Sequence, residues 1–191
     1  IAAEMGDADL KALVEQIAAE SLPVVEDPGI LSPRAFIDEV LHERFPNPAI
    51  PDTPQRIAAD TSQKLPVRYG GTLRRYARQS EQALAGLEFA PLVFAGWCRY
   101  LLGVDDRGNA MPVSPDPMLP QLQAHLKGIE VGRPDSLAGQ LRPILSNAAL
   151  FGVDLYAAGL GERTEEMFRD MLAGPGAVRA TLHRNCACKQ P

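Results

Sequence analysis

Apolar residues recur along the chain at spacings of three and four, which is the pattern of helices with one buried side. The first such stripe joins Leu10, Leu13, Val14 and Ile17. Asp9 precedes it, and its carboxylate can accept hydrogen bonds from the free N–H groups of a first helical turn. The pattern therefore predicts an amphipathic helix that begins at this aspartate.

Ser32 and Pro33 mark the start of a second predicted helix. Serine is favoured as an N-cap, and proline fits the first helical position because no N–H is needed there. The apolar positions that follow recur at helical spacing. They predict a buried stripe formed by Phe36, Ile37, Val40 and Leu41.

The segment from Leu92 to Leu102 is apolar on nearly every side. A helix without a polar face is typical of the centre of a fold. Arg99 is the one charged residue in it, and we expect its guanidinium to reach a carboxylate or the surface along its aliphatic stem. Gly103 stands where a left-handed residue would end the helix.

The same periodicity continues through the rest of the chain, whereas alternating runs of β-branched residues, which would indicate strands, do not occur. The fold class is therefore predicted to be all-α. Further helices are expected over Thr72–Leu84, from Asp116-Pro117, from Ser136, over Glu162–Leu172 and from Pro175 to about His183.

A proline-rich loop leads into one short helix within residues 45–73. Thr53 or Asp52 is suited to the N-cap of this helix and Pro54 to its first position. Because a residue that precedes proline is pushed towards extended geometry, the helix is expected to end near Lys64, before Pro66.

Arg56, Asp60 and Lys64 are spaced four residues apart within this predicted helix. At about 100° per residue they share one face, and the two cations lie roughly 12 Å apart along the axis. Two long side chains can span that separation and converge on a small polar ligand. An ordinary surface helix with ion pairs one turn apart is the alternative interpretation.

The 191-residue chain has a formal net charge of −5, yet residues 54–79 hold six Lys or Arg against one Asp. This basic segment would attract anionic or hydroxyl-rich ligands. The acidic balance of the whole chain argues against nucleic acid as the main partner. No apolar run approaches the roughly 20 residues that cross a membrane, and no signal peptide is visible. A cytoplasmic location, with no membrane partner, is therefore expected.

Three cysteines are too few for a disulfide framework. Cys98 lies in the apolar segment and is expected to be buried. Cys186 and Cys188 are expected to lie in an exposed tail and not to bind metal, because a structural zinc needs four ligands and only His183 is near. Gly159-Leu-Gly161 mimics the start of a dinucleotide-binding loop but lacks its third glycine, and we expect a turn between helices there.

Several motifs together resemble one known family. They are the runs Arg44–Thr53, Arg56 with Asp60–Pro66, Gly96–Tyr100, Gly103–Asn109 and Asp116–Leu119. These runs are similar to the C-terminal domain of the mannitol dehydrogenase family, the long-chain, zinc-independent dehydrogenases of polyols and hexuronates. The resemblance extends over most of the chain.

The resemblance implies a multi-helical domain over residues 1–191, like the C-terminal domains of the mannitol and 6-phosphogluconate dehydrogenases. In the family such a domain closes over NAD, which is held mainly by an N-terminal Rossmann domain, and no metal takes part. Neither that domain nor the family's catalytic K-x-x-x-x-N-x-x-H run occurs in this sequence. No catalytic or cofactor-binding residue is therefore assigned, and the chain is expected to be the C-terminal part of a longer enzyme, inactive alone.

The resemblance also implies roles for particular residues. The positions that match Arg56 and Lys64 contact the polyol or keto-sugar in the family. Asp60 would hold one or both of these side chains in position, and Asn47 would contact the ligand or form a turn, the turn being favoured. The implied reaction interconverts a polyol or aldonate with its keto-sugar, with D-mannonate and D-fructuronate preferred over D-mannitol and D-fructose.

Two other functions remain open from the sequence. One is a non-catalytic helical module that binds or scaffolds. The other is a domain of a dehydrogenase that acts on phosphorylated sugars. The basic helix expected at Leu73–Arg78 would suit a phosphate.

Overall fold

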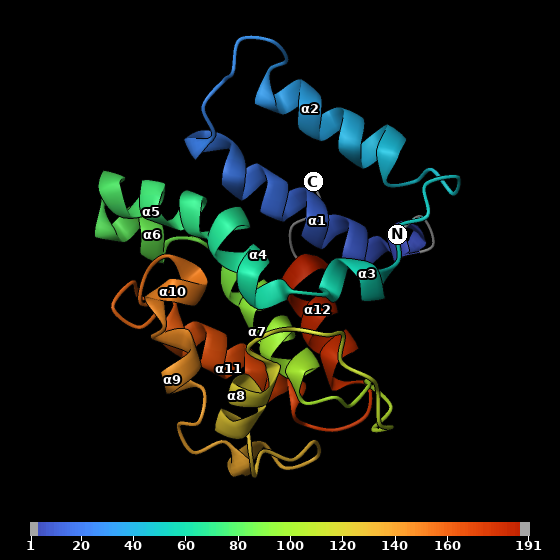
Figure 1. Cartoon of the computed structure of the whole chain (residues 1–191), viewed down its shortest axis with the longest axis vertical. Coiled ribbons are helices and arrows are strands. Elements are labelled where there is room, and N and C mark those ends of the chain that lie inside the picture. The colour runs from blue at the N-terminus through green and yellow to red at the C-terminus, as the bar shows by residue number, and fades with distance from the viewer. Residues whose placement is uncertain (1–3, 188–191) are drawn as a thin grey trace.

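The computed structural model describes residues 4–187, which form helices joined by loops and contain no strand (Figure 1). The nearest approach to a sheet is two isolated β-bridges, Val104 with Ala110 and Glu130 with Arg133. The predicted all-α fold is therefore confirmed. In chain order the elements are η1 (Glu4–Gly6), α1 (Ala8–Ser21), η2 (Leu22–Val24), α2 (Pro33–Glu39), η3 (Val40–Arg44), α3 (Pro54–Ala58), α4 (Thr61–Arg68), α5 (Gly70–Gln79), α6 (Glu81–Ala85), α7 (Ala90–Leu101), α8 (Leu119–His125), η4 (Pro134–Ser136), α9 (Arg142–Leu145), α10 (Ala148–Phe151), α11 (Gly161–Met171) and α12 (Ala177–Ala187).

The apolar helix α7 lies at the centre of the fold, as its sequence predicts, and α11 packs along it. Phe94 and Trp97 on α7 meet the ring of Phe151 edge to face, at centroid distances of 4.9 and 5.9 Å. Cys98 is fully buried, and this burial raises the pKa of its thiol to about 12. The thiol therefore stays protonated and packs as a small apolar group.

Arg99 does not reach the surface or a carboxylate, contrary to the sequence-based expectation. Its side chain is only 3% exposed and donates to the backbone carbonyls of Met171, Val104 and Asp105, at 3.4, 2.6 and 3.1 Å. Burial lowers the pKa of Arg99, while the nearby carboxylates of Asp106 and Asp105 act in the opposite direction. The guanidinium thus joins the end of α7, the following turn and the end of α11.

The pair Gly70-Gly71 begins helix α5 and does not interrupt the chain as a loop. The backbones of Gly70 and Gly152, at the end of α10, approach closely: a Cβ on Gly152 would lie 2.7 Å from Gly70 Cα, so position 152 requires glycine. Gly152 has φ +80°, which glycine adopts at little cost. The basic helix predicted over Thr72–Leu84 is instead divided at Ser80, whose hydroxyl caps α6.

The stripe predicted for the second helix is mostly not buried. Ser32 and Pro33 do start α2, but Phe36 remains 54% exposed and Ile37 and Val40 are half-buried; only Leu41 is covered. Figure 1 shows α2 at the edge of the molecule. The helical period was correct, but Phe36 lines an open cavity beside the connector that precedes α2, so the pattern did not lead to burial.

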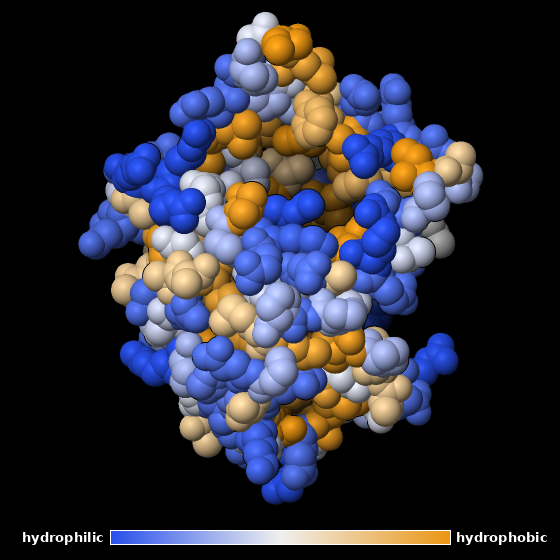
Figure 2. All heavy atoms as spheres, in the orientation of Figure 1, coloured by the Kyte–Doolittle hydropathy of each residue, from blue (hydrophilic) through white to orange (hydrophobic). Residues whose placement is uncertain are grey.

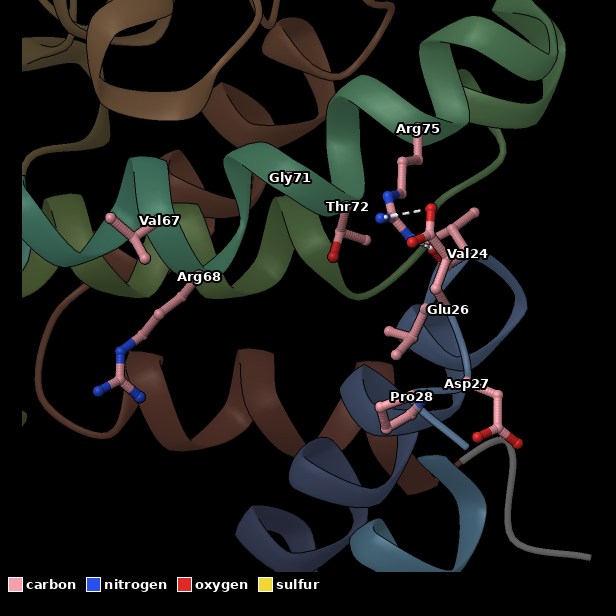
Figure 3. A pocket seen from close by; sticks show the side chains of 10 residues that line it. Val24, Glu26, Asp27, Pro28, Val67, Arg68, Gly71, Thr72 and Arg75 are labelled. Carbon is pink, nitrogen blue, oxygen red and sulfur yellow. Dashed lines mark hydrogen bonds and ion pairs between the residues drawn. The ribbon is translucent and has the colours of Figure 1, made fainter. Parts of the chain in front are cut away.

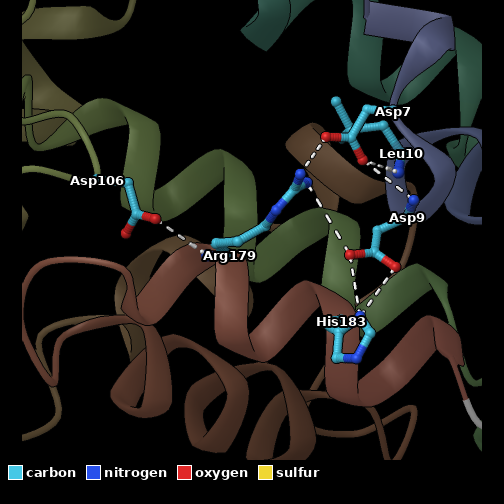
Figure 4. A network of polar contacts seen from close by, with 6 residues as sticks. All are labelled: Asp7, Asp9, Leu10, Asp106, Arg179 and His183. Atoms are coloured by element: carbon cyan, nitrogen blue, oxygen red, sulfur yellow. Dashed lines mark hydrogen bonds and ion pairs between the residues drawn. The ribbon is translucent and has the colours of Figure 1, made fainter.

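The N-terminal helix is fastened to the last helix by a polar network (Figure 4). Asp7, and not the predicted Asp9, caps α1 by accepting from the N–H groups of residues 9 and 10. Its carboxylate also accepts a hydrogen bond from Arg179 on α12, while Asp9 lies 3.2 Å from Nδ1 of His183. Asp106 accepts from the N–H of Arg179 and fixes the start of α12.

Removing the Arg179 guanidinium should raise the pKa of Asp7. Its hydrogen bond is the main cause that lowers this pKa from 3.8 to about 2. Ionised Asp7 therefore stabilises the fold above about pH 4, and this contribution is lost as the pH falls towards about 2. NMR titration of the Asp7 carboxyl should show a higher pKa in Arg179→Met than in the native protein, while the hydrogen bonds of the helix cap still lower it. It should show no change in Arg184→Met, which lies on the same helix as Arg179 but removes a pair with Asp170 of α11. An unchanged Asp7 pKa in Arg179→Met would contradict this assignment.

The remaining helices differ from the predictions mainly at their ends. The helix predicted from Asp116-Pro117 begins at Leu119, and Ser136 ends η4 instead of capping a helix. Cys186 is buried in α12, which corrects the prediction of an exposed tail, and Cys188 lies outside the described residues. Within residues 4–187 no helix has the length and apolar character needed to cross a bilayer.

Candidate functional site

The segment predicted as one helix over residues 54–64 is two helices with a sharp bend between them. Helix α3 ends at Ala58, Ala59 is extended, and Asp60 takes the left-handed conformation with φ 54° and ψ 34° before α4 begins. Among the described residues it is the only non-glycine with positive φ. The prediction that Arg56, Asp60 and Lys64 share one face of one helix is therefore wrong.

Hydrogen bonds fix the start of α3 and the bend that follows it. Thr53 caps α3 as predicted, accepting from the N–H of Arg56 at 3.2 Å. The N–H of Asp60 donates to the carbonyl of Pro115 at 2.9 Å, and its own carbonyl accepts from the N–H of Lys64, which starts α4. An aspartate tolerates left-handed geometry better than most residues, which suits this position.

Helix α4 continues to Arg68, past the end expected near Lys64. Pro66 lies inside it and removes one N–H donor. Leu65 is buried there at 6% exposure, and this burial favours the helical geometry that the following proline opposes. Tertiary packing therefore overrides the local preference.

Asp116 anchors the bend from a distant part of the chain. Its carboxylate accepts from the N–H and hydroxyl of Ser62, at 2.7 and 2.6 Å, and from the N–H of Met118 at 2.8 Å. Burial would raise the pKa of Asp116, but the hydrogen bonds from Ser62 and Met118 outweigh it, and the pKa is lowered. The sequence marked Asp116 as the start of a helix and as part of a family motif, and gave it no role at the bend. The serine at the first turn of α4 gave no signal of this long-range partner.

The two candidate cations each have a partner within the segment. Arg56 pairs with Asp52, one turn before it, and its side chain is 65% exposed. The ammonium of Lys64 donates to the carbonyl of Ile57 at 2.9 Å. This carbonyl belongs to the last turn of α3, where a cation is favoured by the helix dipole. The side chain of Asp60 makes no described contact with either cation, so its predicted supporting role is not seen; its backbone shapes the bend instead.

The bend nevertheless lets the side chain of Lys64 reach the backbone of α3. Because Lys64 reaches over the bend to the carbonyl of residue 57, its ammonium lies against the backbone of the residue that follows Arg56. Both cations lie on accessible parts of the molecule, since Arg56 is exposed and Lys64 is half-buried. A ligand with hydroxyl or carboxylate oxygens can replace Asp52 and the Ile57 carbonyl as their acceptors.

Asn47 forms the turn that the sequence favoured for it. Its side-chain oxygen accepts from the N–H of Ala49 at 2.9 Å, and its carbonyl accepts from the N–H of Ile50 at 3.3 Å. This is an Asx turn, which holds the proline-rich loop in shape before α3.

An apolar hollow of about 690 Å³ lies between α1, α3, α4 and α7. The face seen in Figure 2 is hollowed in its upper half, with hydrophobic residues inside. We name it the α1–α7 hollow; its lining includes Leu13, Val14, Ile57, Val93, Trp97 and Tyr100. Neither Arg56 nor Lys64 is among its described lining residues, so the two cations and the hollow are separate features.

A second cavity, of about 470 Å³, lies between the connector that follows η2 and helices α4 and α5 (Figure 3). Arg75 is held there by Glu26 at 2.9 Å and by the carbonyl of Val24 at 2.5 Å. Figure 3 shows Arg68 pointing away from Arg75. Arg75, one of the six cations of residues 54–79, therefore holds the loop that follows η2 against α5.

The described residues contain no cluster of three or more His, Cys, Asp or Glu side chains that could hold a metal ion. Gly159-Leu-Gly161 is a turn that leads into α11, as predicted. A Cβ on Gly161 would lie 2.5 Å from the Tyr156 ring. The glycine therefore allows close packing of that ring and does not cradle a phosphate.

Comparison with known proteins shows which family the chain is related to. A profile of the mannitol dehydrogenase C-terminal domain matches residues 1–167. The chain is 52% identical over 182 residues to D-mannonate oxidoreductase from Thermotoga maritima, covering 95% of the chain and 34% of that protein. It is 38% identical over 153 residues to mannitol 2-dehydrogenase from Emericella nidulans, covering 76% of the chain and 26% of that protein.

A solved structure shows the same fold. It is the Pseudomonas fluorescens mannitol 2-dehydrogenase in a ternary complex with NAD and D-mannitol, with a TM-score of 0.72 and 26% identity. The match covers 98% of the present chain and 35% of that protein, so the chain spans about a third of the length of its relatives. The chain therefore belongs to the mannitol dehydrogenase family, and what it matches is the family's C-terminal domain.

Proposed function

We propose that this chain is the substrate-binding part of an NAD-dependent dehydrogenase that interconverts D-mannonate and D-fructuronate. The observation that carries the choice of substrate is the 52% identity with a D-mannonate oxidoreductase along nearly the whole chain. The D-mannitol and D-fructose pair is second, because the mannitol 2-dehydrogenase relatives are less similar.

Arg56 and Lys64 are the proposed substrate contacts. A guanidinium is suited to a carboxylate or to two neighbouring hydroxyl groups, and an ammonium acts as a compact donor. Their present acceptors, Asp52 and the Ile57 carbonyl, keep both cations positioned at the bend. A sugar acid would supply oxygen atoms to both.

The hydride would be carried by NAD, bound mainly by an N-terminal Rossmann domain outside these residues. That domain is the chain's proposed protein partner, and the 191 residues alone are proposed to be inactive. We place the protein in the cytoplasm, where NAD-dependent sugar metabolism takes place. The contribution of this chain is to bind and orient the sugar.

A panel of substrates tests this function with the intact protein expressed from its natural reading frame. With NAD present, D-mannonate should give the highest kcat/KM, followed by D-mannitol. A hexitol phosphate as best substrate would favour a sugar-phosphate dehydrogenase. No NADH with any of them would favour a non-catalytic binding or scaffold module.

A further inference from the structure

The α1–α7 hollow is an apolar surface that the proposed sugar site does not use. Its walls come mainly from four helices, and two of the hydroxyl groups on them already have hydrogen-bond partners. Tyr100 accepts a hydrogen bond from the N–H of Ser114 at 2.6 Å, and the hydroxyl of Thr61 lies 3.3 Å from the carbonyl of Ala58. The surface that remains suits apolar side chains and would bind a hydroxyl-rich or charged ligand poorly.

The packing around the hollow is incomplete. Trp97 lines it, and its buried Nε1 has no acceptor among the described residues. Such unsatisfied buried donors are rare in finished cores. Ile57 also lines the hollow and is 41% exposed, which is high for a large apolar side chain.

The start of the described chain lies at this hollow. Glu4 and Met5, the first two described residues, both contribute to its lining. A polypeptide that continues upstream of residue 4 would therefore leave the domain at the hollow. Relatives of this chain are about three times as long, and the match is to their C-terminal domain.

We infer that the hollow is the docking site of an apolar segment of the longer protein, upstream of the 191 residues. This inference rests on the proposed function only in that it assumes a preceding N-terminal part. A covalent connection at the rim gives such a segment a high effective concentration, so modest apolar contact is enough to keep it in place. The segment would cover Val14, Ile57 and Val93 and link the sugar-binding bend to the N-terminal part.

Cysteine footprinting tests this in the 191-residue chain and in the intact protein. Val14→Cys places a thiol inside the hollow, and Ala19→Cys places one on the exposed side of the same helix. Both variants carry Cys188→Ser. Cys98 and Cys186 are buried and should react slowly. A maleimide is the probe, and mass spectrometry measures the modification of each cysteine.

Both engineered thiols should react in the 191-residue chain. In the intact protein, Cys at position 14 should react about 100-fold more slowly, as expected of a closed apolar contact, while position 19 should change by less than about twofold. Equal reactivity of position 14 in the two proteins would overturn the inference. So would its protection in the 191-residue chain by self-association, seen as a dimer in light scattering, or by a co-purified amphiphile. A reading frame that encodes nothing upstream would overturn it too.

The outcome is independent of the activity assays. Protection of position 14 in an intact protein that oxidises no sugar would support the docked segment and reject the dehydrogenase. Activity without protection would do the reverse.

Discussion

Arg99→Met should lower the free energy of unfolding by about 3 kcal/mol, because a buried guanidinium and its three hydrogen bonds to backbone carbonyls are lost at once. Methionine keeps most of the apolar stem, so the effect would come from the lost guanidinium more than from a cavity. For a chain of this size the melting temperature should fall by roughly 6–12 °C.

Urea unfolding followed by circular dichroism measures this change. Arg133→Met is the matched control, since Arg133 is 68% exposed and pairs only with Glu130 at the surface. It should change stability by less than about 0.5 kcal/mol. If Arg99→Met were as stable as the control, Arg99 would not be the link between α7 and α11 that the structure indicates.

Local sequence patterns correctly predicted the elements that are strongly apolar or that begin with a clear capping motif. Helix α7 is apolar on all sides and could only be central, and Ser32-Pro33 and Thr53-Pro54 mark helix starts that the structure contains. The family resemblance in the motif runs is confirmed by the domain profile and by the relatives. The central helix and the helix starts could be predicted because they depend on residues that are close together in sequence.

The bend at Asp60 could not be predicted in this way. It depends on the Pro115 carbonyl and the Asp116 carboxylate, which lie more than fifty residues away in sequence. The four-residue spacing of Arg56, Asp60 and Lys64 is that of one straight helix, and nothing in it indicates two helices joined by a bend. Arg99 shows the same limit, because one of its carbonyl partners, that of Met171 on α11, is 72 residues away in sequence.

For α2 the sequence predicted too much: the apolar stripe was expected to be buried and is mostly exposed or half-buried. The spacing of Phe36 and its neighbours is helical, but burial also needs an opposing surface, and the described residues provide little of one. A sequence pattern indicates which side of a helix is apolar. It does not indicate what covers that side.

The second large effect is kinetic and concerns Lys64. In the intact protein, Lys64→Ala should lose a charged hydrogen bond to the sugar acid, a cost of about 2 kcal/mol. Lys64 also caps α3 through the Ile57 carbonyl, so the melting temperature must be measured alongside the kinetics. Lys11→Ala is the control, because Lys11 lies exposed on α1 and pairs weakly with Glu15.

The most direct test is the kcat/KM for D-mannonate of the intact Lys64→Ala variant. We expect it to fall roughly 30-fold while the fold is retained and Lys11→Ala stays near the native value. A Lys64→Ala enzyme with native kcat/KM would show that this ammonium only caps a helix, and the bend would no longer be the sugar-binding site.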